Sequence, residues 1–198
     1  MWTAGLHPSA DPGQSMFAKS WKRMWLRHET GGKSVSLRSR SRAATPWGVE
    51  AVMKLFEKRS LAALMKKIAD AGLLIAFLDR KDEYHPWAAR IFERESPPFY
   101  TAEAILAEVA AVLESADEVL QMIELGDLVV ALDLQTESSA IRAMIRKYKD
   151  RKMDLGDACC VRLSELLAGS VVYTVDKKDF TIYRKNNRQP VPCIFPSS

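Results

Sequence analysis

Short apolar segments alternate with longer amphipathic segments along residues 65–198. Runs rich in Val, Ile, Leu and Ala predict strands over 67–69, 128–130 and 171–174, with extended pieces over 99–100 and 191–194. Apolar positions at helical spacing predict helices over 73–78, 84–94, 101–113, 116–124, 137–148 and 157–167. Strands that alternate with helices indicate a mainly parallel sheet covered on both faces, so the predicted fold is a three-layer α/β/α domain of the α/β class.

The N-terminal part of the chain has a different pattern. Phe17 to His28 places aromatic residues every four positions among Lys and Arg, which predicts a basic amphipathic helix. Residues 33–42 read KSVSLRSRSR and predict disorder, with a nucleic-acid-binding arm as the alternative. Residues 49–64 again show helical spacing.

The charge changes sign between these two parts. The net charge is +4, but residues 1–64 hold 11 Lys and Arg against 4 Asp and Glu, whereas residues 65–198 hold 18 against 21. We therefore expect a basic extension over 1–64, disordered or partly helical, and a compact domain that begins at Met65.

The three cysteines lack the spacing of a metal site or a disulfide framework, which is typical of a reducing cytosol. No apolar run approaches the roughly 18 residues that span a bilayer. The N-terminus is interrupted where a signal peptide would be apolar, by His7, Pro8, Asp11 and Pro12. We expect a cytoplasmic protein with no membrane partner.

Two carboxylates directly follow predicted buried strands. Asp70 follows the strand over 67–69, and Asp176 follows the strand over 171–174 after one more residue. In parallel α/β sheets ligands bind at this edge, and a buried carboxylate is costly unless a cation meets it. The structural alternatives are a helix cap for Asp70 and an ordinary turn acid for Asp176 or Asp179.

Further acids lie in predicted helices. Glu108 has apolar neighbours three and four residues away on both sides, so we expect its carboxylate on the buried stripe, paired with an Arg or with a ligand. Glu103 lies nearer the start of the same helix, where the dipole favours an acid, and is secondary. Asp154 fits a helix cap, whereas Asp157 runs into an apolar segment that capping explains less well.

Four carboxylates that share one site repel each other and raise each other's pKa unless a cation neutralises them. Ligands that are all oxygen favour Mg²⁺ or Mn²⁺ over zinc, and such an ion activates water for attack on a phosphodiester. The sequence therefore predicts a metal site if Asp70, Glu108, Asp157 and Asp176 meet.

The segments Asp70-Ala71-Gly72-Leu73-Leu74, Leu106-Ala107-Glu108, Asp157-Ala158, Thr174-Val175-Asp176 and Asp179-Phe180 stand in an order that resembles the PIN domain family. The resemblance extends from about Met65 to the end of the chain and is strongest to VapC-type toxin ribonucleases. One departure is Ala71, which stands where the family usually has Ser or Thr.

The resemblance implies a PIN-like α/β/α fold and Mg²⁺-dependent cleavage of RNA by the toxin of a toxin–antitoxin pair. It assigns Asp70, Glu108, Asp157 and Asp176 as the acidic quartet, with Thr174 in support. It further implies a cognate antitoxin and a homodimer. The competing hypothesis is a PIN-like module that binds RNA or protein without cutting.

Overall fold

The computed structural model describes residues 65–197 of the chain. The helix predicted over 17–28, the disorder predicted over 33–42 and the helical segment predicted over 49–64 lie outside the described residues.

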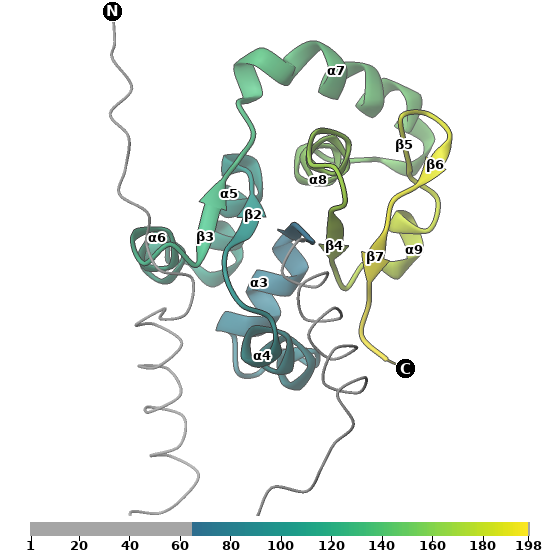
Figure 1. The fold of residues 1–198 in the computed structure, drawn as a ribbon. Coiled ribbons are helices and arrows are strands. Elements are labelled where there is room, and N and C mark those ends of the chain that lie inside the picture. The colour runs from purple at the N-terminus through teal and green to yellow at the C-terminus, as the bar shows by residue number, and fades with distance from the viewer. Residues whose placement is uncertain (1–64, 198) are drawn as a thin grey trace, which may run out of the picture.

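Five short parallel strands form the central sheet in the order β3–β2–β1–β4–β7 (Figure 1). Their bounds are β1 (Lys67–Ala69), β2 (Phe99–Thr101), β3 (Leu128–Val130), β4 (Val171–Tyr173) and β7 (Cys193–Ile194). Lys67 in the central strand pairs with Phe99 on one side and Val171 on the other. All five strands were predicted, and the parallel sheet is confirmed.

Helices flank the sheet and complete the three-layer α/β/α arrangement that the sequence predicted (Figure 1). They are α3 (Ala71–Leu78), α4 (His85–Arg94), α5 (Glu103–Leu113), α6 (Asp117–Glu124), α7 (Leu134–Lys147), the 3₁₀ helix η1 (Lys149–Arg151), α8 (Leu155–Leu166) and α9 (Lys177–Phe180). Helix α3 packs on α4 and α5, α7 packs on α8, and α5 also contacts α8. No helix within residues 65–197 is long and apolar enough to cross a membrane.

The start of α3 lies close to the segment that follows β4. The sequence suggested that Ala71-Gly72 forms a tight turn, but both residues belong to α3. Gly72 is needed for a different reason: a Cβ atom there would lie 2.5 Å from Cγ2 of Val175. The missing side chain lets α3 approach the end of β4, which brings Asp70 toward Thr174.

Several local predictions were wrong. Thr101 does not cap α5, because Ala102 is the N-cap residue and the Thr101 hydroxyl donates to the Ala69 carbonyl at 3.2 Å. Helix α7 begins at Leu134 rather than at residue 137, since Asp133 caps it by accepting from two backbone N–H groups.

Helix α9 and the antiparallel hairpin of β5 (Arg184–Lys185) and β6 (Gln189–Pro190) were not predicted. These elements are too short for hydrophobic periodicity to show. A turn signal was available in Asn186 and Asn187, which both adopt positive φ, a conformation that asparagine tolerates better than most residues.

Candidate acidic site

Asp70 follows the central strand β1 directly and is 8% exposed. It occupies the N-cap position of α3, yet its side chain makes no capping hydrogen bond, so capping does not explain it. The Thr174 hydroxyl donates to Oδ2 at 2.6 Å, and the Cys160 thiol lies 3.5 Å from Oδ1. Burial raises the pKa of Asp70, these hydrogen bonds oppose the shift, and the charge of Asp154 adds to it.

Thr174 joins the two carboxylates that follow neighbouring strands. Its hydroxyl donates to Asp70 and accepts from the backbone N–H of Asp176 at 3.0 Å. The Asp176 carboxylate in turn caps α9, accepting from the Asp179 N–H at 3.0 Å. The backbone of Asp176 is therefore linked to the Asp70 carboxylate through the Thr174 hydroxyl, whereas the Asp176 carboxylate caps α9.

Asp154 and Asp157 stand at the start of α8. Asp154 caps the helix by accepting from the Asp157 N–H at 2.8 Å, as the sequence suggested. The Asp157 carboxylate takes no part in this cap and accepts a hydrogen bond from the Tyr183 hydroxyl at 2.9 Å. Burial raises the pKa of Asp157 to about 7, and the charges of Asp154 and Asp70 contribute to that shift.

Glu108 projects from α5 toward the same region. The expectation that it lies on the buried stripe was wrong: the residue is exposed, Val112 beside it is 57% exposed, and α5 buries Ile105 and Val109. A Cβ atom on Gly156 would nevertheless lie 2.9 Å from Oε2 of Glu108 and 3.4 Å from Oδ1 of Asp154. Partial burial raises the pKa of Glu108, followed by the charges of Asp154 and Asp70.

The charges of these side chains act on one another. Asp154 raises the pKa of the other three acids, Asp70, Glu108 and Asp157. Within residues 65–197, no Lys or Arg forms an ion pair with any of these four carboxylates. Three segments far apart in the sequence thus bring negative charge to the carboxyl ends of the strands, and no side chain of the described residues forms an ion pair with these carboxylates.

The donor chemistry suits a hard divalent cation, because every candidate ligand atom is a carboxylate oxygen. In the described part of the chain, however, no three His, Cys, Asp or Glu side chains are arranged so that they could hold a metal ion. The acids therefore fit such an ion by chemistry and by their unneutralised charge, without forming a ligand cage.

Sequence reasoning ranked the acids differently from the structure. It treated Asp154 as a helix cap and only a secondary candidate. In the structure the charge of Asp154 raises the pKa values of Asp70, Glu108 and Asp157. It missed the residues that shape the site, namely Gly156, Cys160 and Tyr183. Tyr183 carries no sequence signal, because its contact with Asp157 depends on how the chain returns after α9. The catalytic and metal-binding roles assigned to the acids stay predictions.

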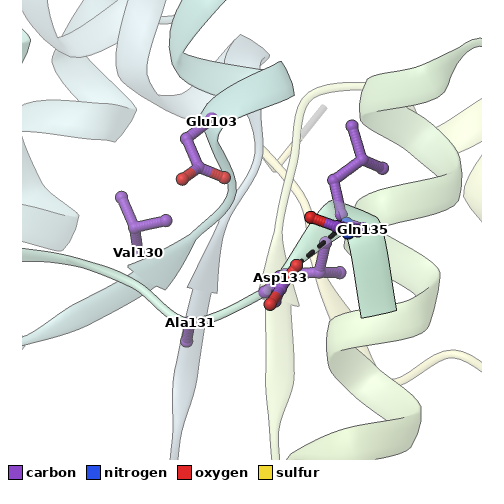
Figure 2. Close-up of a pocket in the computed structure, with 7 residues that line it drawn as sticks. Glu103, Val130, Ala131, Asp133 and Gln135 are labelled. Carbon is purple, nitrogen blue, oxygen red and sulfur yellow. Dashed lines mark hydrogen bonds between the residues drawn. The ribbon is translucent and has the colours of Figure 1, made fainter. Parts of the chain in front are cut away.

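A cavity of about 810 Å³ opens at the carboxyl ends of β2 and β3 (Figure 2). It is lined by Glu103, Val130, Ala131, Leu132, Asp133, Leu134 and Gln135. Glu103 begins α5, the helix that also carries Glu108. The cavity therefore lies at the carboxyl ends of the parallel strands, the same end of the sheet at which the acids lie.

No match was found among curated proteins. A family model described as PIN domain matches residues 67–186, which covers more than half of the chain and includes all the acids discussed above. Proteins with this domain are generally nucleases, and they typically use divalent metal ions. The chain belongs to the PIN domain family.

Proposed function

We propose that this protein is a metal-dependent endoribonuclease that hydrolyses RNA phosphodiester bonds. The observation that carries the proposal is the gathering of Asp70, Glu108, Asp154 and Asp157 from three separate segments. Burial and neighbouring charge, including that of Asp154, raise the pKa values of Asp70, Glu108 and Asp157. Repulsion and desolvation make this arrangement of carboxylates unfavourable, and a bound cation would offset that free energy.

In this proposal Asp70, Glu108 and Asp157 would hold Mg²⁺ or Mn²⁺, with Asp176, which follows β4, as a further ligand. Asp154 contributes charge next to them. An ion held there would supply Lewis-acid chemistry, which activates water at neutral pH and offsets negative charge on a phosphate. No side-chain nucleophile is required.

Neighbouring side chains position the acids. Thr174 fixes one oxygen of Asp70 and leaves the other beside the weak donor Cys160. This support comes from the residue that directly follows β4. Tyr183 orients the Asp157 carboxylate, and Gly156 leaves the space that the Glu108 carboxylate needs.

The biological setting is a further part of the proposal. We propose a cytoplasmic toxin of a toxin–antitoxin pair, held inactive by a cognate antitoxin and able to form a homodimer. Growth arrest on expression of the full chain, relieved by co-expression of a small neighbouring gene, tests this setting. Normal growth with active, soluble enzyme contradicts it.

The enzymatic proposal is tested by incubating the purified full chain with RNA in Mg²⁺, in Mn²⁺ and in EDTA. Asp70→Asn is the test variant. Asp150→Asn removes the same charge at an exposed position in η1 and serves as the control. We expect metal-dependent cleavage by the wild type and by Asp150→Asn, and a loss of at least about a hundredfold in Asp70→Asn. Equal cleavage by all three proteins indicates a contaminating nuclease.

A second candidate function is a PIN domain that binds RNA or a protein without cutting. It is favoured by the finding that, within residues 65–197, no three potential ligand side chains form a metal-binding group. Folded protein that binds RNA but cleaves none in either metal supports this candidate over the nuclease.

A further inference from the structure

The cavity beside Glu103 has walls that the sheet holds in place. Val130 ends β3, and the Ala131 N–H donates to the carbonyl of Thr101 at the end of β2 at 3.0 Å. Glu103 follows Thr101 by two residues and opens α5. Val130 and Glu103 thus lie at or just beyond the ends of paired strands, so the sheet fixes where the two sides of this open pocket lie.

Glu103 is the unengaged acid of this cavity. It makes no hydrogen bond and no ion pair within residues 65–197, and it is exposed. Asp133 differs, because its oxygens accept from the backbone N–H groups of Gln135 and Thr136 and from the Thr136 hydroxyl. These hydrogen bonds lower the pKa of Asp133 and keep its carboxylate occupied as the cap of α7.

The remaining lining is partly apolar. Val130 and Ala131 are half-buried, and Leu134 is 38% exposed, so these three side chains supply the apolar surface of the cavity. Figure 2 shows Glu103 on one side and Gln135 on the other in this view. The Gln135 side-chain amide, which makes no hydrogen bond in the described part of the chain, adds one donor group and one acceptor to the lining.

A phosphate does not suit a cavity whose two charged groups are carboxylates. A nucleobase that presents donors suits it. Single-stranded RNA offers unstacked bases, which proteins bind by stacking and through their Watson–Crick edges. Guanine presents two adjacent donors, N1–H and the N2 amine, which match the two oxygens of one carboxylate, with O6 beside them for an amide donor.

The cavity lies at the start of α5, the helix that also carries Glu108 of the acidic site. Glu103 and Glu108 are five residues apart, a rise of about 7.5 Å along the helix. The charges of Asp154 and Glu103 both act on the Cys159 thiol, whose pKa is raised first by burial. Five residues turn the helix by about 140°, so Glu103 leaves α5 on a different side from Glu108 and lies outside the acidic site.

We propose that this cavity is a base-recognition subsite that binds a guanine of single-stranded RNA. The Glu103 carboxylate accepts from N1–H and the N2 amine of the base. Leu134 contributes apolar contact, and Gln135 donates to O6. The proposal rests on the ribonuclease function for its substrate class and gives that ribonuclease a preference for cutting near guanosine.

The test measures binding without cleavage. Labelled oligouridine carrying a single central guanosine is titrated with the full chain in EDTA at fixed salt, and fluorescence anisotropy gives the affinity. The matched ligands carry inosine, which lacks only the N2 amine, or uridine at that position. The protein variants are Glu103→Gln and, as a control with the same charge change at the other end of α5, Glu114→Gln.

We expect the wild type and Glu114→Gln to bind the guanosine ligand about tenfold more tightly than the inosine ligand, and Glu103→Gln to bind the two equally. Equal affinities in the wild type, or a preference that survives Glu103→Gln, overturn the subsite and leave the cavity to a cationic side chain of a protein partner.

Cleavage mapping in Mg²⁺ separates this inference from the proposed function. Guanosine-selective binding with no cleavage keeps the subsite and removes the nuclease. Cleavage with no preference for neighbouring guanosine keeps the nuclease and removes the subsite.

Discussion

Removing the charge of Asp157 is expected to stabilise the metal-free protein, and by an amount that depends on pH. Burial and the charges of Asp154 and Asp70 raise its pKa from 3.8 to about 7, while the Tyr183 hydroxyl opposes the shift. A carboxyl whose folded pKa is raised contributes its full stability below pH 4, and this contribution is lost as the pH rises toward 7. Above pH 7 the folded protein holds a charge that the unfolded chain solvates better.

The size of the effect follows from the shift. A displacement of about three pKa units corresponds to about 4 kcal/mol at 1.36 kcal/mol per unit. Asp157 is only half-buried, so solvent screening reduces this figure, and we expect about 2 kcal/mol at pH 8. In Asp157→Asn the amide oxygen still accepts from Tyr183, so the hydrogen bond is retained while the charge is removed.

The assay is urea unfolding of the wild type, Asp157→Asn and the exposed-site control Asp150→Asn in EDTA at pH 4, 6 and 8. We expect the free energies of unfolding of the wild type and Asp157→Asn to agree near pH 4. They separate through pH 6, with the variant more stable by about 2 kcal/mol at pH 8. Mg²⁺ at pH 8 then stabilises the wild type more than the variant. A variant that is less stable at pH 8, or a difference independent of pH, refutes the reasoning.

Three further substitutions test the shape of the site. Gly156→Ala is expected to leave the unfolding midpoint nearly unchanged, because the added methyl is closer than van der Waals contact only to the carboxylate of Glu108, the end of a flexible side chain, yet to lower Mg²⁺-dependent cleavage at least about tenfold; unchanged cleavage contradicts this. Thr174→Val removes the hydroxyl that bonds Asp70 and is expected to cost about 1–3 kcal/mol in chemical denaturation, whereas Thr174→Ser retains most of the stability; equal losses in both refute a hydrogen-bonding role. Gly72→Ala is expected to cost about 1–3 kcal/mol through the contact with Val175, and Val175→Ala in the same chain is expected to relieve most of that cost; a double variant no more stable than Gly72→Ala alone contradicts the contact.

The sheet could be predicted from the sequence because each strand is a short apolar run between helical segments. Ile68 and Val172, for example, are fully buried in the centre of the sheet. Both strands end in a segment that carries an acid, so the carboxyl edge could be identified as well. Parallel strands place such ends together whatever the intervening chain does.

The depth and pairing of each acid could not be predicted in the same way. Glu108 has apolar neighbours in the sequence, but the residues around it on α5 are partly exposed, so periodicity overstated its burial. Asp154 looked like a simple cap, and it does cap α8. Its charge nevertheless acts on Asp70 and Asp157, an effect that depends on how α8 packs against the ends of the strands. Such distances are set by tertiary packing, which a single sequence does not encode locally.

The same geometry links folding to the proposed activity. Holding Asp70 buried and Asp157 beside Asp154 costs free energy, as the raised pKa values indicate. The fold meets that cost with local support: the Thr174 hydroxyl, the Tyr183 hydroxyl and the cap of α8. A divalent ion that binds only the folded state would stabilise it further, by an amount that grows with the ion's concentration above Kd.

If the acids serve a metal, removing one of them therefore has opposite effects on two measurable quantities. It raises the stability of the metal-free domain, and it reduces the stability gained on adding the metal. An acidic cluster that binds no metal is expected to show the first effect without the second. Measuring both effects therefore distinguishes a metal-binding site from an acidic cluster that binds none.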